Sequence, residues 1–359
     1  MSLADTSTAP RAKRPLDRVQ QARRVTVGLA VLLVITSLVS LSWGASGTAF
    51  WPTVRALMSG DEVSQVDRIV LLDIRLPRMA MAILVGAALA VSGAVMQGLF
   101  RNPLADPGIV GVSAGASLGA ITAIVLGGYL PLALQDMLGT SVIAIAAFLG
   151  ALAATVVLYR VATRNGQTSV ATMLLAGIAI AAMVGALSGL LVYVADDAQL
   201  RNLTFWNLGS LAAATWAKLF AAMPIILAGL IASLFLARGL NGMALGEAAA
   251  MHMGIPVQRT KRIAVMAVAA ATGAAVAVSG SIGFVGIVVP HLLRLATGPD
   301  HRALLPNAAL LGATLLLMAD MISRTIVAPA ELPIGIVTAV IGAPVFLYIL
   351  LKRHAMMGI

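Results

Sequence analysis

The chain has 359 residues and a formal net charge of +10, yet only 11% of its residues are charged and 60% are hydrophobic. Soluble domains carry roughly 25% charged residues, so this composition excludes an ordinary soluble protein. The chain contains no cysteine, which excludes disulfides, iron–sulfur clusters and thiolate zinc sites. Long uncharged segments recur along the chain, each near the roughly 20 residues that a helix needs to cross hydrocarbon. We therefore predict an all-α polytopic membrane protein.

Ten segments are apolar enough to be membrane-spanning helices, and a basic tail, residues 1–24, precedes them. The predicted spans are 25–43, 76–100, 107–127, 141–159, 170–194, 217–237, 261–280, 282–297, 305–323 and 334–351. Residues 25–359 would form one ten-helix transmembrane domain. Lys and Arg concentrate in the tail and in the loops on its side, which the positive-inside rule assigns to the cytoplasm. Both termini are therefore predicted to be cytoplasmic, and the net charge is explained without nucleic acid.

Three arginines face outward in this topology. The first outer loop, Gly44 to Arg75, leads to Arg75 and Arg78 at the mouth of the second span. Snorkelling at a helix end explains both arginines on physical grounds alone. Arg324 follows Asp320 by four residues, a spacing that allows an ion pair on one helix face.

The second span ends in a proline-rich turn on the inner side. Pro103 and Pro107 prevent a continuous helix, so Asn102 to Asp106 is expected to turn tightly. Asp106 is expected to be an N-cap, with a proline at the first helical position.

Small residues mark places of close helix packing and a weak inverted repeat. Ala90 to Gly93 reads Ala-Val-Ser-Gly, and the same four residues recur from Ala277 to Gly280 in a span predicted to run the other way. Such a repeat would place a transport pathway between the two halves. Close approach of a second backbone is expected at Gly111, Gly115 and Gly119, which recur every four residues.

The most informative stretch is the polar inner loop 238–260. Good helix formers from Ala244 to His252 predict a short helix, which Gly254 and Pro256 end before a basic cluster. A loop that only reverses the chain needs a handful of residues, so this one is expected to contact a partner. A second short helix is predicted along the outer surface in Asp196–Trp206.

Several kinds of chemistry are missing. No lysine follows a glycine, so the chain has no P-loop, and any ATP must be handled by a partner. No carboxylate lies deep in a predicted span, which disfavours an ion-coupled carrier, for which only Asp106 or Asp320 would serve. A membrane haem protein would have to rely on His291, the one histidine in a predicted span.

A set of motifs resembles one family. The motifs are Arg75-x-x-Arg78, Ser92-Gly-Ala-Val-Met-Gln97, Arg101-Asn-Pro-Leu-Ala-Asp-Pro-Gly108, Leu245-Gly-Glu247, Gly283-Phe-Val-Gly286 with Pro290-His291, and Glu331-Leu-Pro-Ile-Gly335. Together they resemble the FecCD-like permease subunits of bacterial iron-chelate, haem and vitamin B12 ABC importers. The resemblance covers the chain from about residue 70 to its C-terminus.

This resemblance implies the type II ABC importer permease fold, with ten helices per subunit. It implies a homodimer in the bacterial inner membrane, with the transport path at its two-fold axis. Two separate cytoplasmic ATPase subunits would bind ATP and Mg, and a periplasmic binding protein would deliver the substrate. The chain itself would be non-catalytic and would move its substrate by alternating access.

The resemblance also assigns roles to individual residues. The residues implied in coupling to the ATPase are Leu245, Gly246, Glu247, Ala250, Gly254 and Ile255. Those implied in docking the binding protein are Arg75, Arg78 and Arg324, and those implied in a cytoplasmic gate are Asn102, Leu104, Val170 and Ala171. Relatives can carry hydroxyl residues where this chain has Val170 and Ala171, so a more apolar gate is expected.

The transported substrate is assigned from one outer segment. Asp197–Trp206, followed by Asn207–Ser210, looks most like the haem-importing branch of the family. Haem is therefore expected as cargo, with no cofactor or metal held by the chain itself. Ferric siderophores and cobalamin stay open as alternatives.

Overall fold

The computed structural model describes residues 15–43, 50–61, 64–139 and 141–357, and these residues are almost entirely helical. The first half contains α1 (Pro15–Ser42), α2 (Phe50–Ser59), α3 (Gln65–Ile69), the π-helical turn η1 (Val70–Arg75), α4 (Leu76–Phe100), the 3-10 turn η2 (Pro107–Val110), α5 (Val112–Leu126), η3 (Gly127–Tyr129), α6 (Leu132–Leu138) and α7 (Ser141–Ala162). A hairpin of β1 (Thr163–Arg164) and β2 (Gln167–Thr168) follows. The second half contains α8 (Val170–Val194), α9 (Asp197–Leu208), α10 (Trp216–Phe235), α11 (Ala237–Met243), α12 (Glu247–His252), α13 (Val257–Ser279), α14 (Val285–Thr297), α15 (His301–Ser323) and α16 (Ile334–Met357).

Eight helices in the described part of the chain are long and apolar enough to cross a membrane. Two shorter apolar helices, Val285–Thr297 and Ile334–Tyr348, coincide with the eighth and tenth predicted spans. The all-α architecture is thus confirmed, while the count of ten crossings stays a prediction. The first helix begins at Pro15 rather than at residue 25, so the end of the predicted basic tail is helical. Residues 1–14 of that tail lie outside the described residues.

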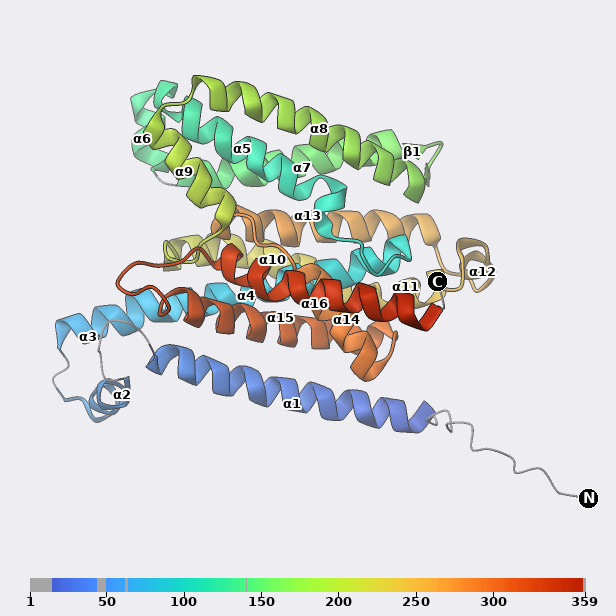
Figure 1. Ribbon diagram of the computed structural model, residues 1–359, viewed down its shortest axis with the longest axis horizontal. Helices are drawn as coiled ribbons and strands as arrows, with labels where there is room; N and C mark the ends of the chain where they lie inside the picture. Colours follow the sequence, from blue (N-terminus) through green and yellow to red (C-terminus); the bar gives the residue numbers. More distant parts are fainter. Residues whose placement is uncertain (1–14, 44–49, 62–63, 140, 358–359) are drawn as a thin grey trace, which may run out of the picture.

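The helices form layers that run between two ends of the molecule (Figure 1). We call the end with α11, α12 and the β1–β2 hairpin the α12 end, and the end with α2, α3, α6 and α9 the α9 end. One layer holds α5, α7 and α8; α4, α10 and α13 lie in the middle; α14, α15 and α16 follow, and α1 lies outermost against α15.

The middle of the bundle is its buried core. In the most apolar stretch of the α4 helix 83% of residues are buried, and in α13 72%, against 28% in α8. The middle helices are rich in alanine, glycine and valine, whose small side chains let neighbouring helices approach closely. Large apolar side chains instead lie exposed on outer helices such as α1 and α7. This is the distribution expected of a protein whose outer surface faces lipid.

A π-helical turn joins α3 to α4 where the sequence predicted only a loop. The Leu76 N–H donates to the Leu71 carbonyl, five residues back, and Pro77 follows at the start of α4. A proline ring clashes with the carbonyl four residues before it in a regular helix. A wider turn relieves this clash, so a single helical rod runs from Gln65 to Phe100.

Glycine contacts confirm most of the predicted close packing. A Cβ on Gly115 would lie 2.3 Å from the Gly150 carbonyl oxygen of α7, and a Cβ on Gly119 would lie 2.0 Å from that of Ala146. Gly111 has a different role. It has a φ of +77° and ends η2 in the left-handed conformation, which glycine adopts without strain.

The two Ala-Val-Ser-Gly copies lie on helices that run in opposite directions between the two ends (Figure 1). In the first copy, a Cβ on Gly93 would lie 1.9 Å from the Gly286 carbonyl oxygen of α14. In the second, Gly280 has a φ of +69° and ends α13. The local roles differ, so an inverted repeat stays a prediction.

We predict that Gly119→Leu lowers the free energy of unfolding by about 3 kcal/mol, the upper end of the usual cost of overpacking. The added side chain would meet the backbone of α7, which cannot rotate away. Thermal unfolding in detergent measures the change. Gly28→Leu on α1 is the matched control, because nothing lies within 4 Å of its Cβ position. Equal melting temperatures for the two variants would contradict the packing described here.

Candidate functional site

The loop 238–260 folds into two short helices at the α12 end. Gly246 has a φ of +109° and precedes α12, so the helix begins at Glu247 and not at Ala244 as predicted. The predicted stop is confirmed: Gly254 has a φ of +75°, and its N–H donates to the Met251 carbonyl at 2.9 Å.

The α12 helix has a buried side and an exposed apolar tip. Ala250 is fully buried, and Ile255 packs its Cδ1 methyl where a Cβ on Gly242 would lie. The tip consists of three exposed side chains, Leu245, Met251 and Met253, which are 72%, 58% and 48% exposed. Exposed apolar groups grouped on one projecting element are typical of a protein–protein contact.

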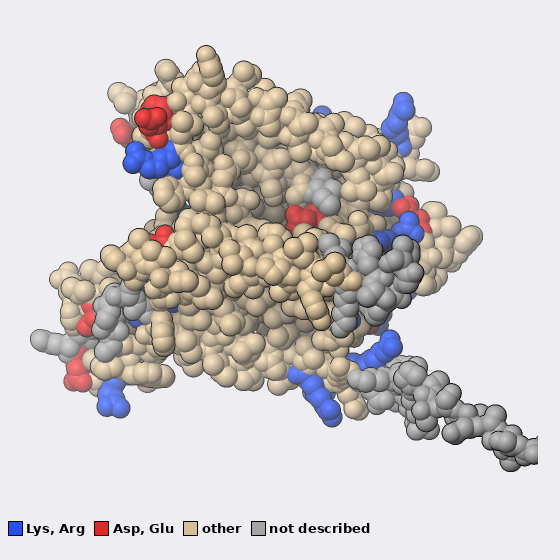
Figure 2. Space-filling model, viewed as in Figure 1, with Lys and Arg blue, Asp and Glu red and all other residues tan. Residues whose placement is uncertain are grey.

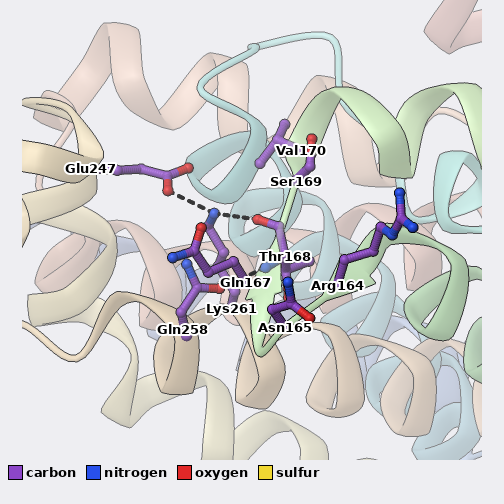
Figure 3. A pocket seen from close by; sticks show the side chains of 9 residues that line it. All are labelled: Arg164, Asn165, Gln167, Thr168, Ser169, Val170, Glu247, Gln258 and Lys261. Atoms are coloured by element: carbon purple, nitrogen blue, oxygen red, sulfur yellow. Dashed lines mark hydrogen bonds and ion pairs between the residues drawn. The ribbon is translucent and has the colours of Figure 1, made fainter.

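An ion pair ties α12 to α13 at the foot of the tip (Figure 3). The Lys261 ammonium lies 2.7 Å from Glu247 Oε2 and donates a second hydrogen bond to the Thr168 carbonyl at 2.6 Å. The Lys261 side chain is 2% exposed. The sequence grouped Lys261 with Arg259 and Arg262 as one basic cluster, but only Lys261 turns inward.

The β1–β2 hairpin holds the start of α8 against α13. Asn165 and Gly166 form its turn, with φ of 50° and 74°, and the Thr168 N–H donates to Gln258 Oε1 at 2.8 Å. The Asn-Gly pair is the strongest short signal in a sequence for a two-residue hairpin, so this turn could have been predicted from the sequence. The hairpin, Val170, Glu247, Gln258 and Lys261 line a pocket of about 620 Å³ (Figure 3).

The predicted gate residues lie on two elements near this end. The turn begins at Arg101, whose φ is 49°, and the Asn102 side chain accepts a hydrogen bond from the Leu104 N–H at 3.0 Å. Val170 is half-buried and Ala171 exposed at the start of α8. The η2 turn, which follows this segment, packs against α8, where a Cβ on Gly111 would lie 3.6 Å from Ile180. That the four residues form one gate stays a prediction.

Asp106 caps η2 as predicted. Its Oδ1 accepts a hydrogen bond from the Gly108 N–H at 2.8 Å. Burial raises the pKa of this carboxyl, while the hydrogen bond from Gly108 acts in the opposite direction.

Arg78, at the α9 end, is buried in an ion-pair network. Its Nε lies 2.9 Å from Asp320 Oδ1, and its Nη1 lies 2.8 Å from Glu331 Oε1. The predicted pair within α15 is also present, with Arg324 Nε 3.7 Å from Asp320 Oδ2.

Arg75 and Arg324 are buried as well, at 5% and 7% exposure. Arg75 donates to the Leu41 carbonyl at 2.6 Å, and Arg324 donates to the Ser40 carbonyl at 2.6 Å and to its hydroxyl at 2.9 Å. The interpretation of Arg75 and Arg78 as snorkelling arginines is therefore wrong for this conformation. Their guanidinium groups join α1, α4 and α15 from inside.

One histidine lies where the sequence predicts it and another does not. His291 lies half-buried on α14, within the predicted span 282–297. His301 begins α15, ahead of the predicted start of that span at residue 305, and its Nδ1 lies 2.8 Å from Asn241 Oδ1. Within the described ranges, no three His, Asp or Glu side chains gather closely enough to hold a metal ion.

Comparison with known proteins agrees with this geometry. The model of the FecCD transport family matches residues 32–352. The hemin transport system permease protein HmuU of Yersinia pestis is 45% identical over 93% of this chain and 97% of its own length. The cobalamin import system permease protein BtuC of Halobacterium salinarum is 42% identical over 86% of this chain and 81% of its own length.

A vitamin B12 import system permease protein BtuC of Escherichia coli is 41% identical over 94% of this chain and 98% of its own length. A solved metal-chelate type ABC transporter in an inward-facing conformation superposes with a TM-score of 0.79 at 33% identity, covering 92% of this chain and 99% of that one.

The fold and its projecting α12 tip define the membrane-spanning permease subunit of a type II ABC importer. The chain belongs to the FecCD transport family. Permease subunits of this class are not catalytic, since a separate subunit hydrolyses ATP.

We predict that Arg78→Met destabilises the protein by about 3–5 kcal/mol, because it leaves the Asp320 carboxylate buried and short of a partner. Arg78→Met combined with Asp320→Leu should recover part of that loss, since it removes the unpaired carboxylate but also takes the carboxylate partner from Arg324. Arg68→Met, at an exposed arginine on α3, is the control and should stay within about 0.5 kcal/mol of the wild type. Chemical unfolding in detergent measures all three. A double variant no more stable than Arg78→Met would contradict the network.

Proposed function

We propose that this chain is the permease of an ATP-driven importer that moves haem from the periplasm to the cytoplasm. The assignment of haem as the cargo is supported by the 45% identity, over 93% of the chain, to a protein named as a hemin transport permease. A homodimer would enclose the path, with two ATPase subunits on one side and a periplasmic binding protein on the other. The path would need no cofactor on this chain, and haem is its cargo.

The α12 end is proposed to face the cytoplasm. Arg160, Arg164, Arg259 and Arg262 lie on elements that reach this end, where α1 also begins and α16 ends (Figure 1). An excess of cations in short loops favours the cytoplasmic side. Charged atoms gather mainly at the two ends of the face in Figure 2, as expected if the region between them crosses the membrane.

The α12 tip is proposed to enter a cleft of the ATPase. In this assignment Leu245, Gly246, Glu247, Ala250, Gly254 and Ile255 form the coupling element. The exposed apolar tip and the buried Ala250 support it, because one side is free for a partner and the other is anchored to the bundle. ATP-driven closure of the two ATPases would move α12 and thereby switch the path between its two open states.

The gate is proposed to form from Asn102 and Leu104 of the turn and from Val170 and Ala171 of α8, each repeated in the second subunit. The surface of α8 supports a gate between two subunits, because it is largely apolar and is exposed in the single chain. Figure 2 shows a hollow between the layer of α8 and the helix α16, where a path would run.

The binding protein is proposed to dock at the α9 end, near Arg75, Arg78 and Arg324. Since all three guanidinium groups are held internally, acidic groups of the binding protein would have to replace internal partners. Glu331 is the most accessible of those partners, with its side chain 39% exposed.

Cobalamin is the second candidate cargo. The 42% and 41% identities to permeases named for cobalamin and vitamin B12 import favour it specifically. Both cargos are large macrocycles, so the proposed path and coupling element serve either one.

The test of the cargo is growth of a deletion strain on haem, on ferric siderophores or on inorganic iron as the only iron source, with a parallel test for cobalamin dependence. We expect loss of growth on haem alone, restored by the wild-type gene and not by Glu247→Ala. Normal growth on haem with a defect on a siderophore or on cobalamin would overturn the haem assignment and keep the importer.

We predict that Met251→Glu reduces co-purification of the ATPase subunit by at least about tenfold, because a charge would enter an apolar contact. Met251 is 58% exposed on α12, so the change should not disturb folding. Met58→Glu is the matched control, since Met58 is 85% exposed on α2 at the opposite end. Equal recovery of the ATPase with both variants would contradict the assignment of the α12 tip.

A further inference from the structure

Lys261 differs from the basic residues around it. Arg259 and Arg262 are exposed, whereas Lys261 lies inside the protein with 2% of its side chain exposed. A buried ammonium group needs partners for its charge and its donors. Its hydrogen bonds go to two different segments of the chain, to Glu247 of α12 and to Thr168 of β2.

The N–H and the carbonyl of Thr168 both form hydrogen bonds with side chains of α13. The Thr168 carbonyl accepts from Lys261 at 2.6 Å, and the Thr168 N–H donates to Gln258 at 2.8 Å. Gln258 and Lys261 stand three residues apart, so they share one face of α13. Figure 3 shows both side chains directed at the hairpin, with Glu247 beyond the ammonium group.

This clamp lies immediately before the proposed gate. Ser169 caps α8 by accepting from the Thr172 N–H at 3.2 Å, and Val170 is the first residue of the helix. Only one residue separates Thr168 from Val170, so any shift of the Thr168 peptide changes where α8 begins. Lys261 is therefore bonded to the first residue of α12 and to the segment that sets the position of α8.

We propose that Lys261 is a positioning residue that couples α12 to α8, so that a displacement of the docked tip is transmitted to the start of the gating helix. Glu247 is suited to sense a displacement of α12, because its side chain is 35% exposed at the base of the tip while its carboxylate reaches the buried ammonium group. Thr168 would pass the displacement on to the start of α8. The proposal rests on the proposed function for the direction of the signal, whereas the clamp itself stands on the contacts above.

A purely structural ion pair would stabilise the loop without linking two moving parts. The arrangement here is different because one ammonium group bonds to both parts at once. Removing Glu247 or Lys261 should thus have the same effect on coupling, and removing both should add nothing further. Gln258→Ala should loosen the hairpin while leaving the ion pair in place.

The first experiment measures amide hydrogen exchange in the detergent-solubilised permease alone. We expect Lys261→Met to raise exchange in two separate peptides, one containing α12 and one containing residues 163–169. Gln258→Ala should raise exchange only in the second peptide. Arg262→Met, one position along the helix at an exposed side chain, should change neither.

The second experiment measures haem uptake and ATP hydrolysis by the complete complex in proteoliposomes. We expect Lys261→Met, Glu247→Gln and the double variant to lower uptake per ATP hydrolysed by the same factor, about tenfold, with the ATPase still bound. Lys261→Arg should restore part of the coupling, since it keeps the charge and the donors. Arg262→Met should retain the wild-type ratio.

Three results would overturn the proposal, and two of them come from single variants. One is unchanged exchange of residues 163–169 in Lys261→Met; the other is a wild-type uptake ratio in variants that do show increased exchange. A double variant with the product of the two single losses would also contradict a shared path. If the wild-type complex takes up no haem, the proposed cargo fails, and the exchange of the two peptides together with basal ATP hydrolysis still decides the role of Lys261.

Discussion

The close approach of α4 to its neighbours is the constraint on which the rest of the structure depends. A Cβ on Gly86 would lie 2.3 Å from the Gly312 carbonyl oxygen of α15, and Gly93 meets Gly286 of α14 equally closely. Lipid offers no hydrophobic advantage to packing one helix on another, so association relies on dense van der Waals contact between small residues. The α4 helix thus becomes a buried axis, and α13, α14 and α15 take fixed positions around it.

The segments of the chain that are not part of long helices lie at the two ends of the bundle. Backbone without a helical partner cannot face hydrocarbon, so the hairpin, the proline turn and the short helices occur where the bundle meets water or another protein. The charges then divide into two networks. One joins Arg78, Asp320 and Glu331 at the α9 end, and the other joins Glu247 and Lys261 at the α12 end. The first network joins residues 242 and 253 positions apart, and in the second Lys261 also reaches Thr168, 93 positions away.

The two networks differ in how open they are to a partner. At the α9 end the arginine side chains are buried and their carboxylates fill the positions that a docking protein would seek. At the α12 end the apolar tip is already exposed, and only its base is held by an ion pair. In the proposed assignment, an ATPase could dock on the α12 tip without breaking an internal contact, whereas a binding protein at the α9 end would have to displace internal partners of the arginines.

The sequence by itself determined the helical class, most of the spans and the short α12 helix with its stop, because hydrocarbon thickness and the glycine and proline rules act locally along the chain. It also indicated the family, because the family motifs consist of residues that are close together in the sequence. It did not determine which charged side chains turn into the protein. Lys261 looked like its neighbours in the basic cluster, and Arg75, Arg78 and Arg324 looked like residues at a membrane surface. Only tertiary structure decided that these side chains turn inward, because their partners, such as Thr168 and Asp320, lie on helices and turns far away in the sequence.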